Sequence, residues 1–177
     1  IAELWIRKAR LEAQRDLLPW FALPTGLDDL SLPDGKVEAI RAGEQRIFEG
    51  TMASFTSRRD QIQLGIVQVQ TEVEGLLARR AAKEEEIALV AGENARIEQL
   101  AARDLTVRNA VFTIKRENVR LSGEHGEILS SLGRARSRVT ELELEILSLK
   151  DQMRTEAQRE LREIEAELSE MAEQRYV

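Results

Sequence analysis

Residues 87–125 read IALVAGENARIEQLAARDLTVRNAVFTIKRENVRLSGEH, and their apolar positions form mirror images on the two sides of residue 106. Moving away from that residue in either direction, seam positions recur at alternating steps of three and four. A repeat that averages 3.5 residues keeps one apolar seam facing a partner helix, as a coiled coil requires. The mirrored repeat therefore predicts two helices of one chain that fold back on each other.

The same spacing continues along most of the chain. The first ladder runs through Phe48, Met52, Phe55, Arg59, Ile62, Ile66, Val69, Val73, Leu76, Arg80, Lys83, Ile87, Val90, Asn94 and Ile97. The second runs through Val111, Ile114, Asn118, Leu121, His125, Ile128, Leu132, Ala135, Val139, Leu142, Ile146, Leu149 and Met153. Facing pairs, from Ile97 with Ile114 to Arg59 with Met153, have residue numbers that add up to 211 or 212, which places the turn near residue 106.

These ladders predict an all-α fold, a long antiparallel coiled-coil hairpin over residues 34–177. Its arms are expected at about 34–103 and 107–176, with the tip at 104–108. Residues 1–33 are expected to form an N-terminal helix over 2–18, ended by Pro19, and a turn segment at the hairpin base. The second seam slips by one residue after Met153. We expect the short helix to pack there and to make the base a three-helix bundle.

Composition agrees with long helices rather than a compact globule, because 33% of the residues are charged and only 4% are aromatic. The net charge of −6 is unevenly distributed. Residues 96–120 carry six basic and three acidic side chains, whereas residues 141–173 carry four basic and eleven acidic ones. An acidic chain is not suited to bulk binding of nucleic acid, so we expect no nucleic-acid partner.

No pattern of catalytic or cofactor chemistry is found in the sequence. There is no cysteine, and the only histidine, His125, lies in the seam opposite Ile87, where a tolerated core residue is the simplest interpretation. The carboxylates are spread regularly, as on solvated helix faces, and a two-helix seam offers no pocket to shift their pKa values. We therefore expect no enzyme activity, metal or cofactor.

Two polar residues stand out within the apolar seam. Asn94 and Asn118 are predicted to face each other across the hairpin. A paired asparagine layer costs stability but fixes the register of two helices.

No run of 18 apolar residues is present, so no membrane-spanning helix is expected. Because the chain begins at Ile1 and not at methionine, we expect it to be a fragment whose targeting or anchoring segment lies elsewhere.

Several short sequence motifs, and their order along the chain, resemble the hairpin segment of the haemolysin D family, the periplasmic adaptors or membrane fusion proteins of type I secretion. The first helix contains Ala9-Arg10-Leu11-Glu12-Ala13-Gln14-Arg15-Asp16, similar to the family's Arg-Leu-x-Ala-Glu-Arg-Asp, and Phe21-Ala22-Leu23-Pro24 follows it. Gln45-Arg46-Ile47-Phe48-Glu49 opens the long arm. The turn, Asp104-Leu105-Thr106-Val107-Arg108-Asn109-Ala110-Val111, is similar to the family's Gly-Leu-Val-x-(Lys/Arg)-x-x-Leu, with Asp104 in place of the glycine.

The resemblance implies a subunit anchored in the inner membrane of a Gram-negative bacterium, with its hairpin in the periplasm. Several subunits, six in the usual picture, form a homo-oligomer that links an inner-membrane ABC exporter to a TolC-type outer-membrane channel. The family's tip motif is an Arg, a Leu four residues later and a Ser or Thr at the turn; Arg96, Leu100 and Thr106 follow that order, with the last interval one residue short. Beside this motif, Leu105 and Val107 at the tip, amid the basic Arg103 and Arg108, suit docking against the end of a partner, although an ordinary capped turn is the alternative. The expected docking residues are therefore Arg96, Leu100, Arg103, Leu105, Thr106, Val107 and Arg108.

A scaffold coiled coil unrelated to secretion is the alternative hypothesis. It would dimerise through long parallel helices, and a parallel dimer needs no centre of symmetry in its sequence. The mirrored seam therefore favours the hairpin. A nucleic-acid-associated hairpin or enzyme regulator is a third hypothesis, disfavoured by the acidic surface.

Overall fold

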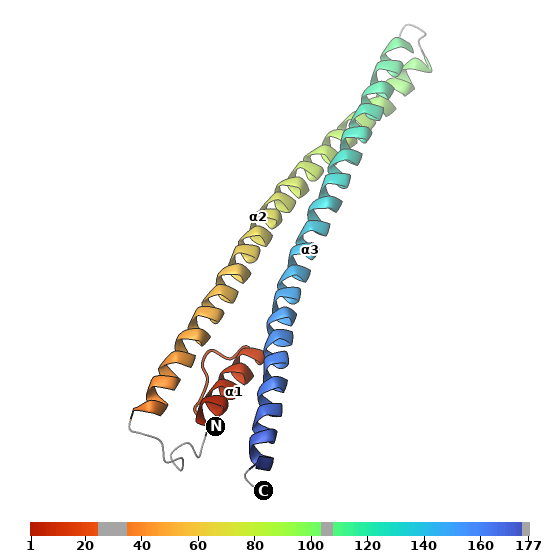
Figure 1. Cartoon of the computed structure of the whole chain (residues 1–177). Helices are drawn as coiled ribbons and strands as arrows, with labels where there is room; N and C mark the ends of the chain where they lie inside the picture. The colour runs from red at the N-terminus through yellow and green to blue at the C-terminus, as the bar shows by residue number, and fades with distance from the viewer. Residues whose placement is uncertain (25–34, 104–107, 175–177) are drawn as a thin grey trace. The chain divides into compact units, whose positions relative to one another are not determined.

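The computed structural model of the chain describes residues 1–24, 35–103 and 108–174, with the side chain of Arg108 excluded. These residues form three helices, α1 (Ala2–Arg15), α2 (Lys36–Ala101) and α3 (Arg108–Gln174), and contain no strand (Figure 1). The predicted all-α hairpin with a short N-terminal helix is confirmed. No described helix is both long enough and apolar enough to cross a membrane.

The first helix ends earlier than the sequence predicted. Pro19 was expected to end it after residue 18, but α1 stops at Arg15. Leu17 adopts a left-handed backbone with φ of 55°. Its N–H donates to the carbonyl of Gln14 at 3.2 Å, and the N–H of Leu18 donates to the carbonyl of Ala13 at 2.9 Å. This pair of bonds is a Schellman motif, which satisfies the last helical carbonyls and turns the chain away before the proline is reached.

The chain divides into two compact units, each described by itself. Unit 1 contains Ile1–Ile62 and Leu144–Val177, and unit 2 contains Gln63–Glu143. Each unit contains part of α2 and part of α3, and unit 1 also contains α1.

In unit 1, opposite faces of α1 contact α2 and α3. One cluster joins Ile6 and Ala13 of α1 to Phe48 of α2, and the ring of Phe21 packs edge-on against Phe48 at a centroid distance of 5.5 Å. A second cluster joins Leu11 of α1 to α3, at Ala157, Leu161 and Ile164. These α3 residues belong to the slipped part of the predicted seam. The three-helix base is thus confirmed, with α1 inserted where the seam changes phase.

In unit 2, α2 and α3 pack through a narrow apolar seam. Leu76 of α2 clusters with Leu132 and Ala135 of α3, and Leu121 is completely buried. The predicted ladders contain all four residues. The seam is close at Gly65, where an added Cβ would lie 3.6 Å from a methyl carbon of Leu142. Burial in unit 2 is therefore confined to the side chains that the heptad pattern selects.

Candidate functional site

The candidate site lies at the turn end of unit 2, which comprises the last turns of α2 and the first turns of α3. The α2 helix ends at Ala101, and the chain then tightens. The N–H of Ala102 donates to the carbonyl of Glu98 at 3.1 Å, and the N–H of Arg103 donates to that of Leu100 at 2.9 Å. The second bond is of the tighter three-residue type common at helix ends. It fixes the backbone of Arg103 just before the turn.

Three of the predicted docking residues can be placed. Arg96, Leu100 and Arg103 are all exposed, and 51% of the Leu100 surface is accessible to solvent. Leu105, Thr106 and Val107 lie outside the described residues, and Arg108 begins α3 with its side chain outside the description. Of the predicted docking residues, those that are described therefore comprise one exposed apolar side chain, Leu100, with an exposed arginine on either side of it in the sequence.

An ion pair joins the two helices next to this surface. The ammonium nitrogen of Lys115 on α3 lies 3.0 Å from Glu98 Oε1 on α2. The hydrogen bond and the charge of Lys115 hold the pKa of the Glu98 carboxyl below its ordinary value. Both side chains are about half exposed, so the pair contributes modestly to stability. Its location helps to hold the ends of α2 and α3 together beside the turn.

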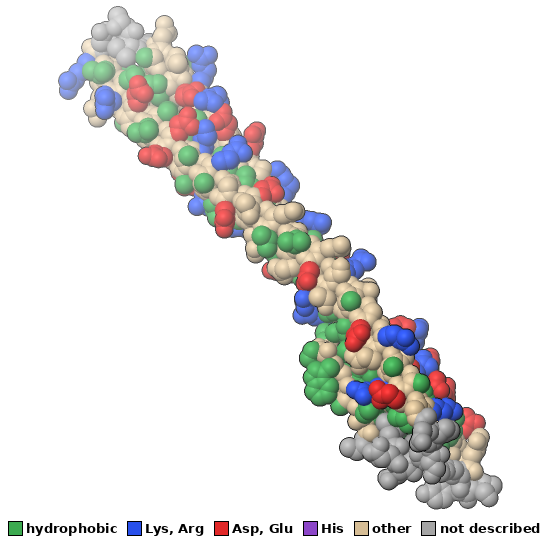
Figure 2. All heavy atoms as spheres, turned by 90° about the vertical axis from the view of Figure 1, so that its left-hand side faces the viewer, with side chains coloured by type: hydrophobic (Ala, Val, Ile, Leu, Met, Phe, Trp, Pro, Cys, Tyr) green, Lys and Arg blue, Asp and Glu red, His purple; other side chains and the backbone are tan. Residues whose placement is uncertain are grey.

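Sequence reasoning missed two exposed apolar residues at the same end of α3. Phe112 is 66% accessible and Val119 is 73% accessible. They are seven residues apart and lie off the seam, since their neighbours in the ladder are Val111 and Asn118. Apolar residues outside the heptad positions are the signal that would have found them. On the face shown in Figure 2, basic and hydrophobic side chains both occur close to the grey residues of the turn.

The predicted asparagine layer is partly buried. Asn94 and Asn118 are both of intermediate exposure. The side-chain oxygen of Asn94 is buried and accepts no hydrogen bond within the described part of the chain. The pairing of Asn94 with Asn118 stays a prediction, and Asn94 carries a local cost because a buried oxygen without a donor loses its hydration.

A longer charge network crosses the seam farther from the turn. Lys83 on α2 donates to Glu86 at 2.6 Å and to Glu124 on α3 at 2.9 Å, while Glu124 also accepts from Arg120. These bonds raise the pKa of Lys83 and lower the pKa of Glu124. Lys83 occupies a ladder position, and its side chain is 19% accessible, so its stem can lie along the seam while its ammonium group reaches the carboxylates at the edge. The network therefore links α2 to α3 through hydrogen bonds between charged side chains.

The histidine forms a polar contact across the hairpin. His125 Nε2 lies 3.2 Å from Glu84 Oε1 on α2, and the ring is partly exposed. The sequence placed His125 opposite Ile87, but its ring reaches a carboxylate one turn away. Among the described residues, no group of three His, Cys, Asp or Glu side chains is arranged to hold a metal ion.

The fold and this turn-end surface define an antiparallel helical hairpin that presents apolar and basic side chains beside its turn. The chain belongs to the AprE long alpha-helical hairpin family, whose model matches residues 1–176. The resemblance to hairpins of type I secretion membrane fusion proteins is therefore confirmed.

Two individual proteins are similar to the chain. The type I secretion system membrane fusion protein PrsE of Rhizobium meliloti (strain 1021) is 30% identical over 175 residues, which cover 99% of this chain and 40% of PrsE. The crystal structure of the soluble domain of LipC, a membrane fusion protein of a type I secretion system, matches with a TM-score of 0.86 at 19% identity. That match covers 98% of this chain and 81% of the LipC soluble-domain chain, and it shows a shared fold. The chain spans two fifths of the length of PrsE.

Proposed function

We propose that the chain is the helical hairpin of a periplasmic membrane fusion subunit for type I secretion. In this role, the subunit links an inner-membrane ABC exporter to a TolC-type outer-membrane channel. Membership of the AprE hairpin family, over residues 1–176, is the observation that carries the proposal. The name of PrsE, which is similar over 99% of this chain, supports the same role.

In this proposal, the turn end of the hairpin docks on the channel. The residues assigned to the contact are Arg96, Leu100, Arg103, Leu105, Thr106, Val107 and Arg108. Exposure of the first three supports the assignment, because docking needs accessible side chains. An apolar anchor surrounded by cations suits a protein surface that is apolar at its centre and polar at its rim. Phe112, exposed at the same end of α3, is added as a second apolar anchor.

The remaining features of the proposal concern the whole subunit. The hairpin lies in the periplasm of a Gram-negative bacterium, and other parts of the subunit anchor it in the inner membrane and contact the exporter. Several copies, six in the usual arrangement, form a homo-oligomer. The subunit acts by connecting its partners and has no catalytic role.

Crosslinking in cells tests the docking. A photoreactive amino acid replaces Thr106 in the full-length subunit, and the matched control carries it at Glu173, an exposed residue near the end of α3. We expect the channel to be captured from position 106 and not from position 173. Capture of the channel only from position 173 would reverse the proposed orientation.

A secretion assay tests the apolar anchor. Leu100→Asp should reduce export at least about tenfold, because a charge replaces the apolar centre of the contact. The control, Leu144→Asp, alters a residue of similar exposure (59%) in unit 1 and should leave export within about twofold. Immunoblots show whether both variants accumulate normally. Equal export by the two variants would remove Leu100 from the docking surface.

A further inference from the structure

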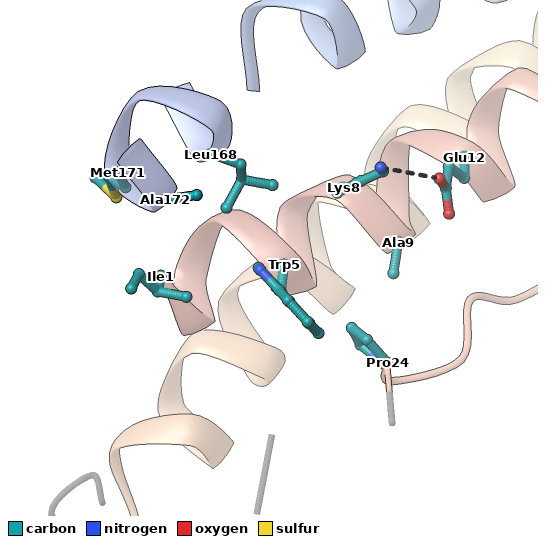
Figure 3. Close-up of a pocket in the computed structure, with 9 residues that line it drawn as sticks. All are labelled: Ile1, Trp5, Lys8, Ala9, Glu12, Pro24, Leu168, Met171 and Ala172. Carbon is teal, nitrogen blue, oxygen red and sulfur yellow. Dashed lines mark ion pairs between the residues drawn. The ribbon is translucent and has the colours of Figure 1, made fainter. Parts of the chain in front are cut away.

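An apolar groove lies in unit 1 between the outer face of α1 and the last turns of α3. Its volume is about 710 Å³. Ile1, Trp5 and Ala9 line it from the α1 side and Leu168, Met171 and Ala172 from α3, and Figure 3 draws them together with Pro24, which also lines the groove. Trp5 is 40% accessible, Met171 39% and Ile1 43%, so three large apolar side chains meet solvent at one place. A groove of this size and lining is suited to an apolar or amphipathic ligand.

The shape of the groove favours a helix as the ligand. Ile1, the N-cap residue of α1, is followed by Trp5 and Ala9 at intervals of four residues, so the three residues form one ridge along the helix. The lined part of α1, from Ile1 to Glu12, is about 17 Å long at the helical rise, which corresponds to about three turns. A helix that lies between two such ridges contacts them with residues i, i+3 or i+4, and i+7.

The charges around the groove define the chemistry of this ligand. Among the described residues that line the groove, Lys8 is the one cationic side chain, and it lies 3.0 Å from Glu165 Oε1 and 3.9 Å from Glu12 Oε1, so its charge is already neutralised. Residues 163–173 of α3 contain five glutamates and no lysine or arginine. Glu167 and Glu170, which flank Leu168 and Met171 in the sequence, are both exposed. These exposed glutamates, together with Glu12 in the lining, make the surroundings of the groove acidic, which attracts cations and repels anionic lipid surfaces and nucleic acids.

We propose that this groove binds an amphipathic helix of another protein, with lysine or arginine bordering its apolar face. The apolar residues of that helix contact Trp5, Leu168 and Met171, and its cations contact Glu167 and Glu170. The inference depends on the groove in unit 1 and is independent of the role proposed for the turn end of unit 2.

Binding of a model helix to the 177-residue chain tests the proposal. Trp20→Phe leaves Trp5 as the only tryptophan and hence as a reporter of the groove. The probe is a synthetic 18-residue peptide of leucine and lysine with leucine at helical spacing. We expect saturable binding and a blue shift of Trp5 emission. A peptide of the same composition in scrambled order, and one with glutamate in place of lysine, should bind at least about tenfold more weakly, since each lacks one required feature.

Variants locate the binding site. Glu167→Lys combined with Glu170→Lys should weaken binding by about fivefold or more, and added salt should reduce that difference because both charges are exposed. Glu143→Lys, an exposed charge reversal on the unit 2 part of α3, is the matched control and should change affinity less than about twofold. Ala172→Trp should block the groove, and circular dichroism shows whether it remains folded.

Other occupants give different results, and each result would overturn the proposal. If Trp5 is already shielded from quenchers without peptide, the chain itself covers the groove. If sedimentation shows self-association that Met171→Glu abolishes, a second copy covers it. Equal affinity for the ordered and scrambled peptides, or no effect of the paired glutamate substitutions, would also exclude a basic helix as the ligand.

Discussion

Arg10 of α1 forms a buried ion pair with Glu44 of α2. The Arg10 side chain is only 6% accessible and that of Glu44 12%. The same guanidinium donates to Gln14 at 2.7 Å and lies 3.8 Å from Glu160 of α3. One cation on the short helix therefore interacts with both long helices of unit 1. Removing one partner of this pair is costly because it leaves the other charge buried with little water to solvate it.

Replacing Arg10 should destabilise unit 1 severely. Arg10→Ala leaves Glu44 buried without its cation, which costs about 3 kcal/mol or more of the free energy of unfolding. Urea unfolding followed by tryptophan fluorescence measures this loss, because both tryptophans, Trp5 and Trp20, are in unit 1. Arg7→Ala is the control: Arg7 pairs with Glu160 at 3.3 Å but is 44% exposed, so its loss should cost less than about 1 kcal/mol. Equal losses would show that burial does not strengthen the Arg10 pair.

Replacing Asn94 should stabilise unit 2. Asn94→Leu removes a buried oxygen without a donor and extends the apolar seam, which should add about 1 kcal/mol to the free energy of unfolding. Asn109→Leu, at an exposed position near the start of α3, should change it by less than about 0.5 kcal/mol. Chemical denaturation followed by circular dichroism compares the two. A loss of stability in Asn94→Leu would instead indicate that Asn94 pairs with Asn118, which the substitution leaves without a partner.

Truncating Leu121 should destabilise unit 2. Its side chain is completely buried, so Leu121→Ala should cost about 2–4 kcal/mol through lost apolar burial and a cavity. Val119→Ala, two residues earlier and 73% exposed, should cost less than about 0.5 kcal/mol. Thermal unfolding of both variants distinguishes the seam from the surface of α3. Similar melting temperatures would mean that the seam contributes little to the stability of unit 2.

The stability of unit 2 should depend on pH at both extremes. Hydrogen bonds from Lys115, Arg120 and Lys83 lower the pKa values of Glu98, Glu117 and Glu124 below the ordinary 4.5. Their stabilising effect is therefore complete above pH 4.5 and is lost as the pH falls through the folded pKa values. Hydrogen bonds to Glu86 and Glu124 raise the pKa of Lys83 above 10.5. Its contribution is complete below pH 10.5 and is lost as the pH rises through the folded value.

Two lysine variants separate these effects. Lys83→Met should make the melting temperature less dependent on pH at both the acidic and the alkaline end, because it removes the partner of Glu124 and the titrating lysine itself. Lys115→Met should make the melting temperature less dependent on pH at the acidic end only, because Glu98 loses the partner that lowers its pKa. Melting temperatures recorded across the pH range by circular dichroism test both. Parallel pH profiles for the wild type and Lys83→Met would exclude the network as a cause.

The seam was predictable because it depends on spacing alone. Leu76, Leu121 and Leu132 occupy ladder positions, and all three are buried. The slip after Met153 also predicted where α1 packs, since Ala157 and Leu161 contact Leu11. Apolar residues that recur on average every 3.5 positions lie along one face of a helix, and that face is removed from water when it packs against a second helix.

Other features required the three-dimensional arrangement. The pairing of Arg10 with Glu44 joins residues 34 positions apart on different helices, and no local spacing links them. His125 Nε2 lies 3.2 Å from Glu84 Oε1, a polar contact that the heptad spacing did not predict, because the spacing selects seam positions and not the partners of their polar ends. The end of α1 at Arg15 was also missed. The left-handed residue that ends the helix is Leu17, whereas this conformation is usually adopted by glycine, so the sequence contains no sign of it.

The sequence by itself therefore determined which faces of the two long helices are apolar, and hence that the chain folds back near residue 106. Heptad periodicity carries that information locally, through the direction in which each side chain leaves its helix. Only the tertiary structure decided which charges meet across the helices, which apolar residues stay exposed and where a groove opens beside Trp5. These features depend on the rotation and stagger of packed helices, which many side chains set together.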